Sequence, residues 1–218
     1  MTRPSLVIFD CDGVLVDTEG LSNARLSQWL TEAGYPIDYE TCRRRFEGRS
    51  LISTVAEIEA TGVSLGEDFV ERWNLALPDL FANGVTEVPH VRGFVEELRA
   101  RDIAYCVASS ARVSKMHITL GATGLLPLFE HAMFSSTMVA RGKPFPDLFL
   151  HAAAAMNFTP ADCIVIEDSV AGTTAGRAAG MTVYSYAGDP FAHRETLASA
   201  GGVVFDNMRD LPAMLGLG

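Results

Sequence analysis

The sequence is poor in cysteine and in positive charge. Its 218 residues include four cysteines, and no two of them form a C-x-x-C pair. Neither a zinc site nor a redox motif is predicted, and buried neutral thiols in a reducing, cytoplasmic setting are expected. Lysine and arginine number 17 against 27 acidic residues, which gives a formal charge of −10. This balance opposes binding to nucleic acid or to an anionic membrane, because either would need clustered basic residues.

Long apolar runs are also absent. No stretch approaches the roughly 18 apolar residues of a membrane span, and the apolar start is too short for a secretory signal. Apolar residues still make up 48% of the chain, so a folded globule is expected, with one domain and a large insertion or two modest domains. The dense basic run from Arg43 to Arg45 is expected to be the solvated face of a helix.

Residues 18–83 show helical periodicity and no strand pattern. Apolar residues recur at helical spacing up to Gly34, which is typical of a helix stop, and further helices are predicted over 51–61 and 67–81. A small helical bundle inserted after the first strand is therefore predicted. The predicted boundaries are residues 17–87 for this bundle and residues 1–16 and 88–218 for the core.

After Pro89 the pattern alternates between helix and strand, which is typical of a parallel sheet with crossover helices. The fold class is therefore α/β, with a five- or six-stranded sheet. The predicted strands cover residues 6–9, 103–108, 131–134, 163–166, 181–186 and 203–205.

Two acids, Asp10 and Asp12, follow directly after the first apolar strand. Residues two apart in a strand point to the same side, so both carboxylates are expected near one another at the ligand-binding edge of the sheet. Such a pair attracts a divalent cation. The dipeptide Asp12-Gly13 also has a simpler interpretation, as a turn.

Two later strands also end in polar pairs, Ser109-Ser110 and Glu167-Asp168. Each pair has a structural explanation, since Ser110 is suited to cap the next helix and acids favour helix N-termini. In a parallel sheet, however, all three strand ends meet at one rim.

Lys143 lies between glycine and proline on a stiff loop that is predicted to cover this rim. A lysine facing several carboxylates is expected where a metal and a substrate phosphate share the space. Mg²⁺ prefers oxygen ligands, which Asp10, Asp168 and Glu167 can supply.

The ordered motifs resemble those of the haloacid dehalogenase superfamily, in the branch with a helical cap after the first strand. They are DCDGVLVDTE from Asp10, Ser109, KPFPD from Lys143, and EDS from Glu167. The resemblance implies a Rossmann-like parallel sheet core with an inserted α-helical bundle cap domain.

The resemblance also implies a reaction, Mg²⁺-dependent hydrolysis of a small phosphorylated metabolite. Asp10 would be the nucleophile, forming an aspartyl-phosphate, and Asp12 would be the proton carrier, with its carbonyl on the metal. Ser109, Ser110 and Lys143 would bind phosphate.

Three readings remain open within and beyond this family. The acid at position 12 favours phosphoryl transfer over dehalogenation. β-Phosphoglucomutases carry a histidine and an arginine in the cap where this chain has Ser22 and Leu51, so the resemblance to the mutases is weaker there. The stretches RFEGRSL and LHAAAAMNF are more similar to bacterial 6-phosphogluconate phosphatases, so Arg45 and Arg49 are the cap candidates for substrate contact. A catalytically silent binding protein with the same fold is the alternative of another class.

Overall fold

The computed structural model describes residues 3–46 and 51–217. Its core is a parallel sheet of six strands in the order β5-β4-β1-β6-β7-β8, which confirms the predicted Rossmann-like α/β core. β1 forms the middle of the sheet because all four of its residues are buried, as an apolar strand covered on both faces requires. The strands are β1 (Leu6–Phe9), β4 (Ala104–Ser109), β5 (Met133–Ser135), β6 (Cys163–Glu167), β7 (Thr182–Tyr186) and β8 (Val203–Phe205).

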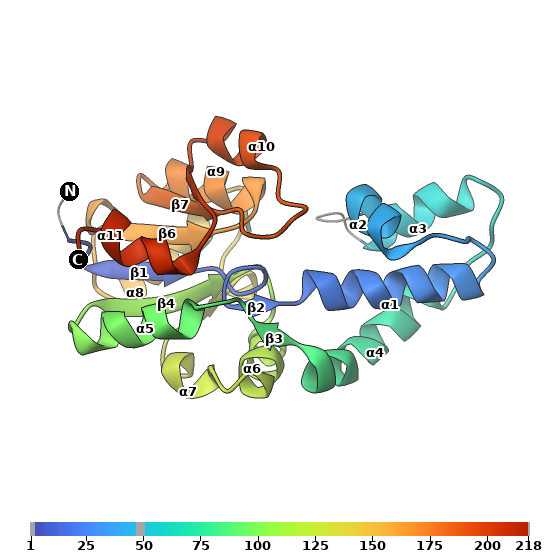
Figure 1. Ribbon diagram of the computed structural model, residues 1–218, viewed down its shortest axis with the longest axis horizontal. Helices are drawn as coiled ribbons and strands as arrows, with labels where there is room; N and C mark the ends of the chain where they lie inside the picture. The colour runs from blue at the N-terminus through green and yellow to red at the C-terminus, as the bar shows by residue number, and fades with distance from the viewer. Residues whose placement is uncertain (1–2, 47–50, 218) are drawn as a thin grey trace.

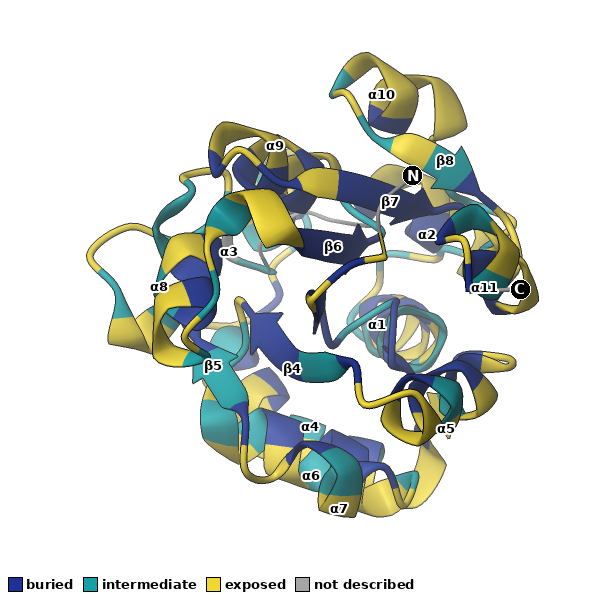
Figure 2. Ribbon diagram, turned by 90° about the vertical axis from the view of Figure 1, so that its left-hand side faces the viewer, coloured by how far each residue is buried: buried dark blue, intermediate teal, exposed yellow. Residues whose placement is uncertain are grey.

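Alternate side chains of β1 point to opposite faces and enter two separate hydrophobic cores. Val7 and Phe9 pack under α5, α6, α7 and α11, whereas Leu6 and Ile8 pack under α8 and α9. The dark blue strands of Figure 2 lie between these two layers. The helices are α5 (Val91–Ala100), α6 (Val113–Ala122), α7 (Leu126–Phe129), α8 (Asp147–Ala155), α9 (Val170–Ala178), α10 (Arg194–Ser199) and α11 (Leu211–Met214), with 3-10 turns η1 (Ser136–Met138), η2 (Pro160–Asp162) and η3 (Met208–Asp210).

The helices between the first and second core segments form a separate lobe, the cap (Figure 1). The cap has a hydrophobic core of its own, which includes Leu30, Ile58, Phe69 and Trp73. All three predicted helices are present there. The cap helices are α1 (Glu19–Glu32), α2 (Tyr39–Phe46), α3 (Leu51–Glu59) and α4 (Phe69–Gly84).

The chain enters and leaves the cap through two short strands that pair with each other. These are β2 (Val16–Asp17) and β3 (Thr86–Glu87), which run antiparallel. At two residues each they are too short to show an alternating pattern, so the sequence did not predict them. They place both connections of the cap side by side on the core.

The basic run of α2 is not uniformly solvated, so the expectation for it is wrong at Arg43. Arg44 and Arg45 are exposed, but Arg43 is 3% exposed. Its Nη2 donates to Asp189 Oδ2 over 2.8 Å, and its guanidinium lies 4.6 Å from the ring centroid of Phe191. A helix turns one of three consecutive residues inward, and the partner of that residue lies on the core, after β7.

Two expectations from composition can be compared with the structure. All four cysteines are buried and free, as predicted for neutral thiols. Within residues 3–46 and 51–217, none of the helices combines the length and the apolar character that crossing a membrane requires.

Candidate active site

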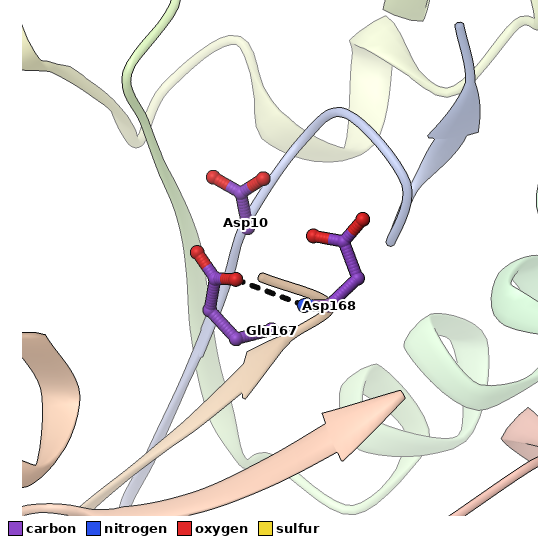
Figure 3. A group of neighbouring side chains, drawn as sticks. All are labelled: Asp10, Glu167 and Asp168. Carbon is purple, nitrogen blue, oxygen red and sulfur yellow. Dashed lines mark hydrogen bonds between the residues drawn. The ribbon is translucent and has the colours of Figure 1, made fainter. Parts of the chain in front are cut away.

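Three carboxylates meet at the carboxyl edge of the sheet, and two neighbouring strands deliver them. Asp10 follows β1, and Glu167 and Asp168 stand at the end of β6. The amide of Asp10 donates to the carbonyl of Ile166 over 2.9 Å, which ties the two strand ends together. Each of the three acids has a carboxylate oxygen within 4.8 Å of the others (Figure 3). The predicted convergence of these strand ends is therefore present.

The ammonium group of Lys143 lies between two of these acids. Its Nζ donates to Asp10 Oδ1 over 2.5 Å and to Glu167 Oε1 over 2.6 Å. The lysine side chain is 5% exposed and its Nζ lies 4.9 Å from the ring centroid of Phe149. The structure thus places Lys143 against the rim, as its loop position predicted.

The other oxygen of Glu167 is held by the start of α9. Glu167 Oε2 accepts from the amide of Asp168 over 2.9 Å, and from the amide and the hydroxyl of Ser169 over 2.7 and 2.8 Å. The Ser169 hydroxyl in turn accepts from the amide of Gly172 and caps the helix. A Cβ on Gly172 would lie 1.7 Å from Glu167 Oε1, so this position requires glycine.

The cluster holds more negative than positive charge. Burial raises the pKa of Asp10 to about 7; Lys143 opposes this shift and the charge of Glu167 adds to it. Burial, with the charges of Glu167 and Asp10, also raises the pKa of Asp168 well above its ordinary value. Burial alone would lower the pKa of Lys143, but Asp10 and Glu167 outweigh burial and raise it. A second cation at the cluster would relieve this excess, and carboxylate oxygens suit Mg²⁺.

Asp12 is not a member of this group of three acids. The expected alternation does not apply because β1 ends at Phe9, and Gly13, with a φ of 79°, donates to the carbonyl of Val16 in a tight turn. The turn interpretation of Asp12-Gly13 is therefore also correct. Asp12 Oδ1 accepts from the hydroxyl of Thr18 over 2.9 Å, and its Oδ2 accepts from Nζ of Lys115 over 2.7 Å.

The two predicted serines differ in position. Ser109 is 1% exposed, and its hydroxyl accepts from the amide of Ala111 over 3.1 Å at the edge where the acids meet. Ser110 is exposed, and its carbonyl accepts from the Ser136 hydroxyl. Ser110 does not cap the following helix, because α6 begins at Val113 with Arg112 in the cap position.

The cap candidates are not brought to the acids by any contact of the described residues. Arg45 Nε lies 2.8 Å from Glu57 Oε1, and its Nη1 donates to the Tyr35 hydroxyl over 2.5 Å. Both partners belong to the cap. Arg49 lies outside the residues that the structure describes.

Sequence reasoning missed Lys115 and Thr18. Lys115 lies on the helix that follows Ser109, and Thr18 lies inside the first motif, directly before its last residue. A cation one turn into a helix that starts at the predicted rim is the signal that would have found Lys115. The roles of both residues depend on contacts that link distant parts of the sequence.

The chain is similar over most of its length to known proteins of one family. A family model described as haloacid dehalogenase-like hydrolase matches residues 7–185. The chain is 32% identical to 6-phosphogluconate phosphatase of Escherichia coli (strain K12), over 98% of this chain and 96% of that protein. It is also 32% identical to β-phosphoglucomutase of Bacillus subtilis (strain 168), over 80% of each protein. A hydrolase from Deinococcus radiodurans R1, solved with phosphate and sodium, matches with a TM-score of 0.89 and 28% identity over 100% of this chain and 97% of that one.

Proposed function

We propose, from the premise that this chain belongs to the haloacid dehalogenase-like hydrolases, that it is a Mg²⁺-dependent phosphatase of a small phosphorylated metabolite. The proposed substrate class is a sugar phosphate or a sugar acid phosphate such as 6-phosphogluconate. One observation carries the proposal: three carboxylates converge at one edge of the sheet, and a single buried lysine contacts two of them, which leaves an excess of negative charge. A phosphatase relative that matches almost the whole chain supports the substrate class.

The proposed metal ligands are Asp10 and Asp168, with the backbone carbonyl of Asp12. Bound Mg²⁺ would neutralise the repulsion between a phosphate group and the attacking carboxylate. Glu167 stands in the same group, but its two oxygens already accept hydrogen bonds from Lys143 and from the start of α9. We therefore assign Glu167 first to holding Lys143 and only second to the metal.

The proposed reaction has two steps at one aspartate. An oxygen of Asp10 forms a bond to phosphorus, and the bond to the leaving oxygen breaks as Asp12 gives that oxygen a proton. Asp12 then takes a proton from the water that attacks the aspartyl-phosphate, which releases inorganic phosphate and restores Asp10. Lys143 and Ser109 would bind the phosphoryl oxygens. Ser110 would bind the phosphate group from the outer side of the rim.

A phosphosugar mutase is the second candidate, because the β-phosphoglucomutase of Bacillus subtilis has the same identity over a shorter match. The two candidates make different products from the same compound. Incubation with β-glucose 1-phosphate gives free phosphate and glucose if the chain is a phosphatase. Accumulation of glucose 6-phosphate would instead support the mutase.

The deciding experiment measures phosphate release from 4-nitrophenyl phosphate with Mg²⁺ and with a chelator, followed by a panel of phosphorylated sugars and sugar acids. We expect Mg²⁺-dependent turnover that Asp10→Asn abolishes while its melting temperature shows a folded protein. Arg44→Met is the control, because Arg44 is exposed on the cap and is expected to leave activity unchanged. Activity that survives Asp10→Asn would contradict the proposal. Failure of the wild type to hydrolyse any of the phosphate esters would contradict it as well.

A further inference from the structure

Lysine is rare in this chain, and both lysines lie at the proposed site. Positions 115 and 143 are the only lysines in the sequence, and arginine supplies the other basic side chains. Lys143 contacts Asp10, and Lys115 contacts Asp12. Asp10 and Asp12 therefore each have their own lysine, and only Lys143 was anticipated from the motifs.

Lys115 reaches Asp12 from the core. It lies on α6, the helix that follows the strand ending at Ser109, and its Nζ donates to Asp12 Oδ2 over 2.7 Å. The Thr18 hydroxyl holds the other oxygen of the same carboxylate. With both oxygens bound, the Asp12 side chain is held in one defined orientation beside the group formed by Asp10, Glu167 and Asp168.

The same ammonium group also contacts the cap. Lys115 Nζ lies 5.0 Å from the ring centroid of Phe81, a residue of α4 that is 2% exposed. Helices α4 and α6 pack side by side at the boundary between cap and core (Figure 1). An aromatic face attracts a cation, so Phe81 fixes the position of the ammonium group that in turn fixes Asp12.

We propose that Lys115 is a positioning residue for the proton transfers of Asp12. This inference rests on the proposed function, in which Asp12 serves the leaving oxygen and then the attacking water. Lys115 itself does not bind the phosphoryl group, which lies with Lys143 and the acidic cluster. Its ammonium group keeps the Asp12 carboxylate in the orientation from which both transfers start, with Thr18 as the second hold.

The test compares Lys115→Met, which keeps the aliphatic stem, with Lys115→Arg, which keeps the charge. The substrates are phenyl phosphate and 4-nitrophenyl phosphate, which differ chiefly in how much their leaving oxygen needs a proton. We expect Lys115→Met to lower kcat/KM for phenyl phosphate by about tenfold or more, with a smaller loss for 4-nitrophenyl phosphate. Lys115→Arg should restore part of the loss.

A double-mutant cycle makes the inference sharper. If Lys115 acts through Asp12, adding Lys115→Met to Asp12→Asn lowers phenyl phosphate turnover no further. The control is Arg99→Met, which removes an exposed cation from α5 near the opposite edge of the sheet. This control is expected to leave both substrates unaffected.

Each other outcome overturns the inference. An equal loss for both substrates with a raised KM would make Lys115 a phosphate-binding residue. A lower melting temperature with an equal loss of activity on both substrates would show that Lys115 has a structural role. Additive losses in the double-mutant cycle would show that Lys115 does not act through Asp12. If the wild type hydrolyses neither ester, the proposed function fails; if it does and Lys115→Met matches the wild type, only this inference fails.

Discussion

The two lysine–aspartate pairs use aspartates only two positions apart in the sequence, but the two pairs differ in their exposure to solvent. In the pair of Lys143 and Asp10 the side chains are 5% and 10% exposed, whereas in the pair of Lys115 and Asp12 they are 33% and 24% exposed. A buried pair is costly to break because the remaining charge has no solvent, but a half-exposed pair adds little stability. The first surroundings suit the proposed nucleophile, which must stay fixed, and the second suit the proposed proton carrier, which water must reach.

Removal of Lys143 is expected to have the largest effect, because it removes the cation of the buried pair. Lys143→Met leaves the carboxylates of Asp10 and Glu167 buried without their cation. We expect it to cost about 3–5 kcal/mol of the free energy of unfolding and to abolish phosphatase activity. Urea unfolding in the presence of a chelator measures this cost. Lys115→Met, the matched change in the half-exposed pair, should cost under about 1 kcal/mol, and equal costs would invalidate the comparison.

Gly172→Ala should have the next largest effect, because it disturbs the support of the buried pair and leaves both lysines in place. The new Cβ would lie 1.7 Å from Glu167 Oε1, so Glu167 and with it Lys143 must shift. We expect a loss of about 1–3 kcal/mol in the free energy of unfolding and a lower kcat. The matched control is Gly93→Ala on α5, where no atom lies within 4 Å of the added Cβ. That control should be neutral or stabilising by up to about 1 kcal/mol, and equal behaviour of the two variants would argue against the close fit at Gly172.

Arg43→Met tests a second contact between cap and core, one that involves neither lysine. Arg43 is buried but its partner Asp189 is 31% exposed, so we expect a cost of about 1 kcal/mol in the free energy of unfolding. Arg44→Met is the control on the same helix, since Arg44 and its partner Glu40 are both exposed. Thermal melting of the two variants measures the difference. A loss as large for Arg44→Met would show that the position on α2, and not the link to the core, decides stability.

Asp168→Asn is expected to have the smallest effect on stability, and of opposite sign. It removes one of the carboxylates in excess at the cluster, so without Mg²⁺ the melting temperature should rise by about 2 °C. The folded-state pKa of Asp168 is raised, so the folded protein binds more protons than the unfolded chain and loses stability as pH rises above the ordinary carboxyl range. The gain of the variant should therefore be larger at pH 8 than at pH 5.

Addition of Mg²⁺ completes this measurement. The wild type should gain thermal stability on adding Mg²⁺, because the ion binds the folded state, and the Asp168→Asn variant should gain much less. Differential scanning fluorimetry with and without a chelator reads both effects. An equal gain in the two proteins would remove Asp168 from the proposed ligands.

The strand ends were predictable from the sequence because a parallel sheet brings them to one edge whatever the loops between them do. Asp10, Ser109 and Glu167 each follow or end an apolar run, and the structure puts all three at that edge. The relation between Asp10 and Asp12 was not predictable in the same way. Strand alternation holds only inside a strand, and the turn after Phe9 gives each aspartate a different direction.

Contacts between residues far apart in the sequence were beyond sequence reasoning for a different reason. Arg43 and Asp189 are 146 positions apart, and Lys115 and Asp12 are 103 apart. A helical pattern shows which residues share a face, but not which distant loop will cover that face. The sequence alone therefore predicts that Arg43 is solvated, because it does not show that the segment after β7 lies beside α2.

The unequal exposure of the two lysines has a practical consequence for chemical labelling. The sequence has two lysine side chains that an amine-reactive reagent could modify. The side chain of Lys115 is 33% exposed and that of Lys143 is 5% exposed, so a reagent at low concentration should modify Lys115 first. A fluorophore or an isotope tag placed there would report on the boundary between cap and core without any engineered cysteine. Lys115 is thus an attachment point next to Asp12, the proposed proton carrier.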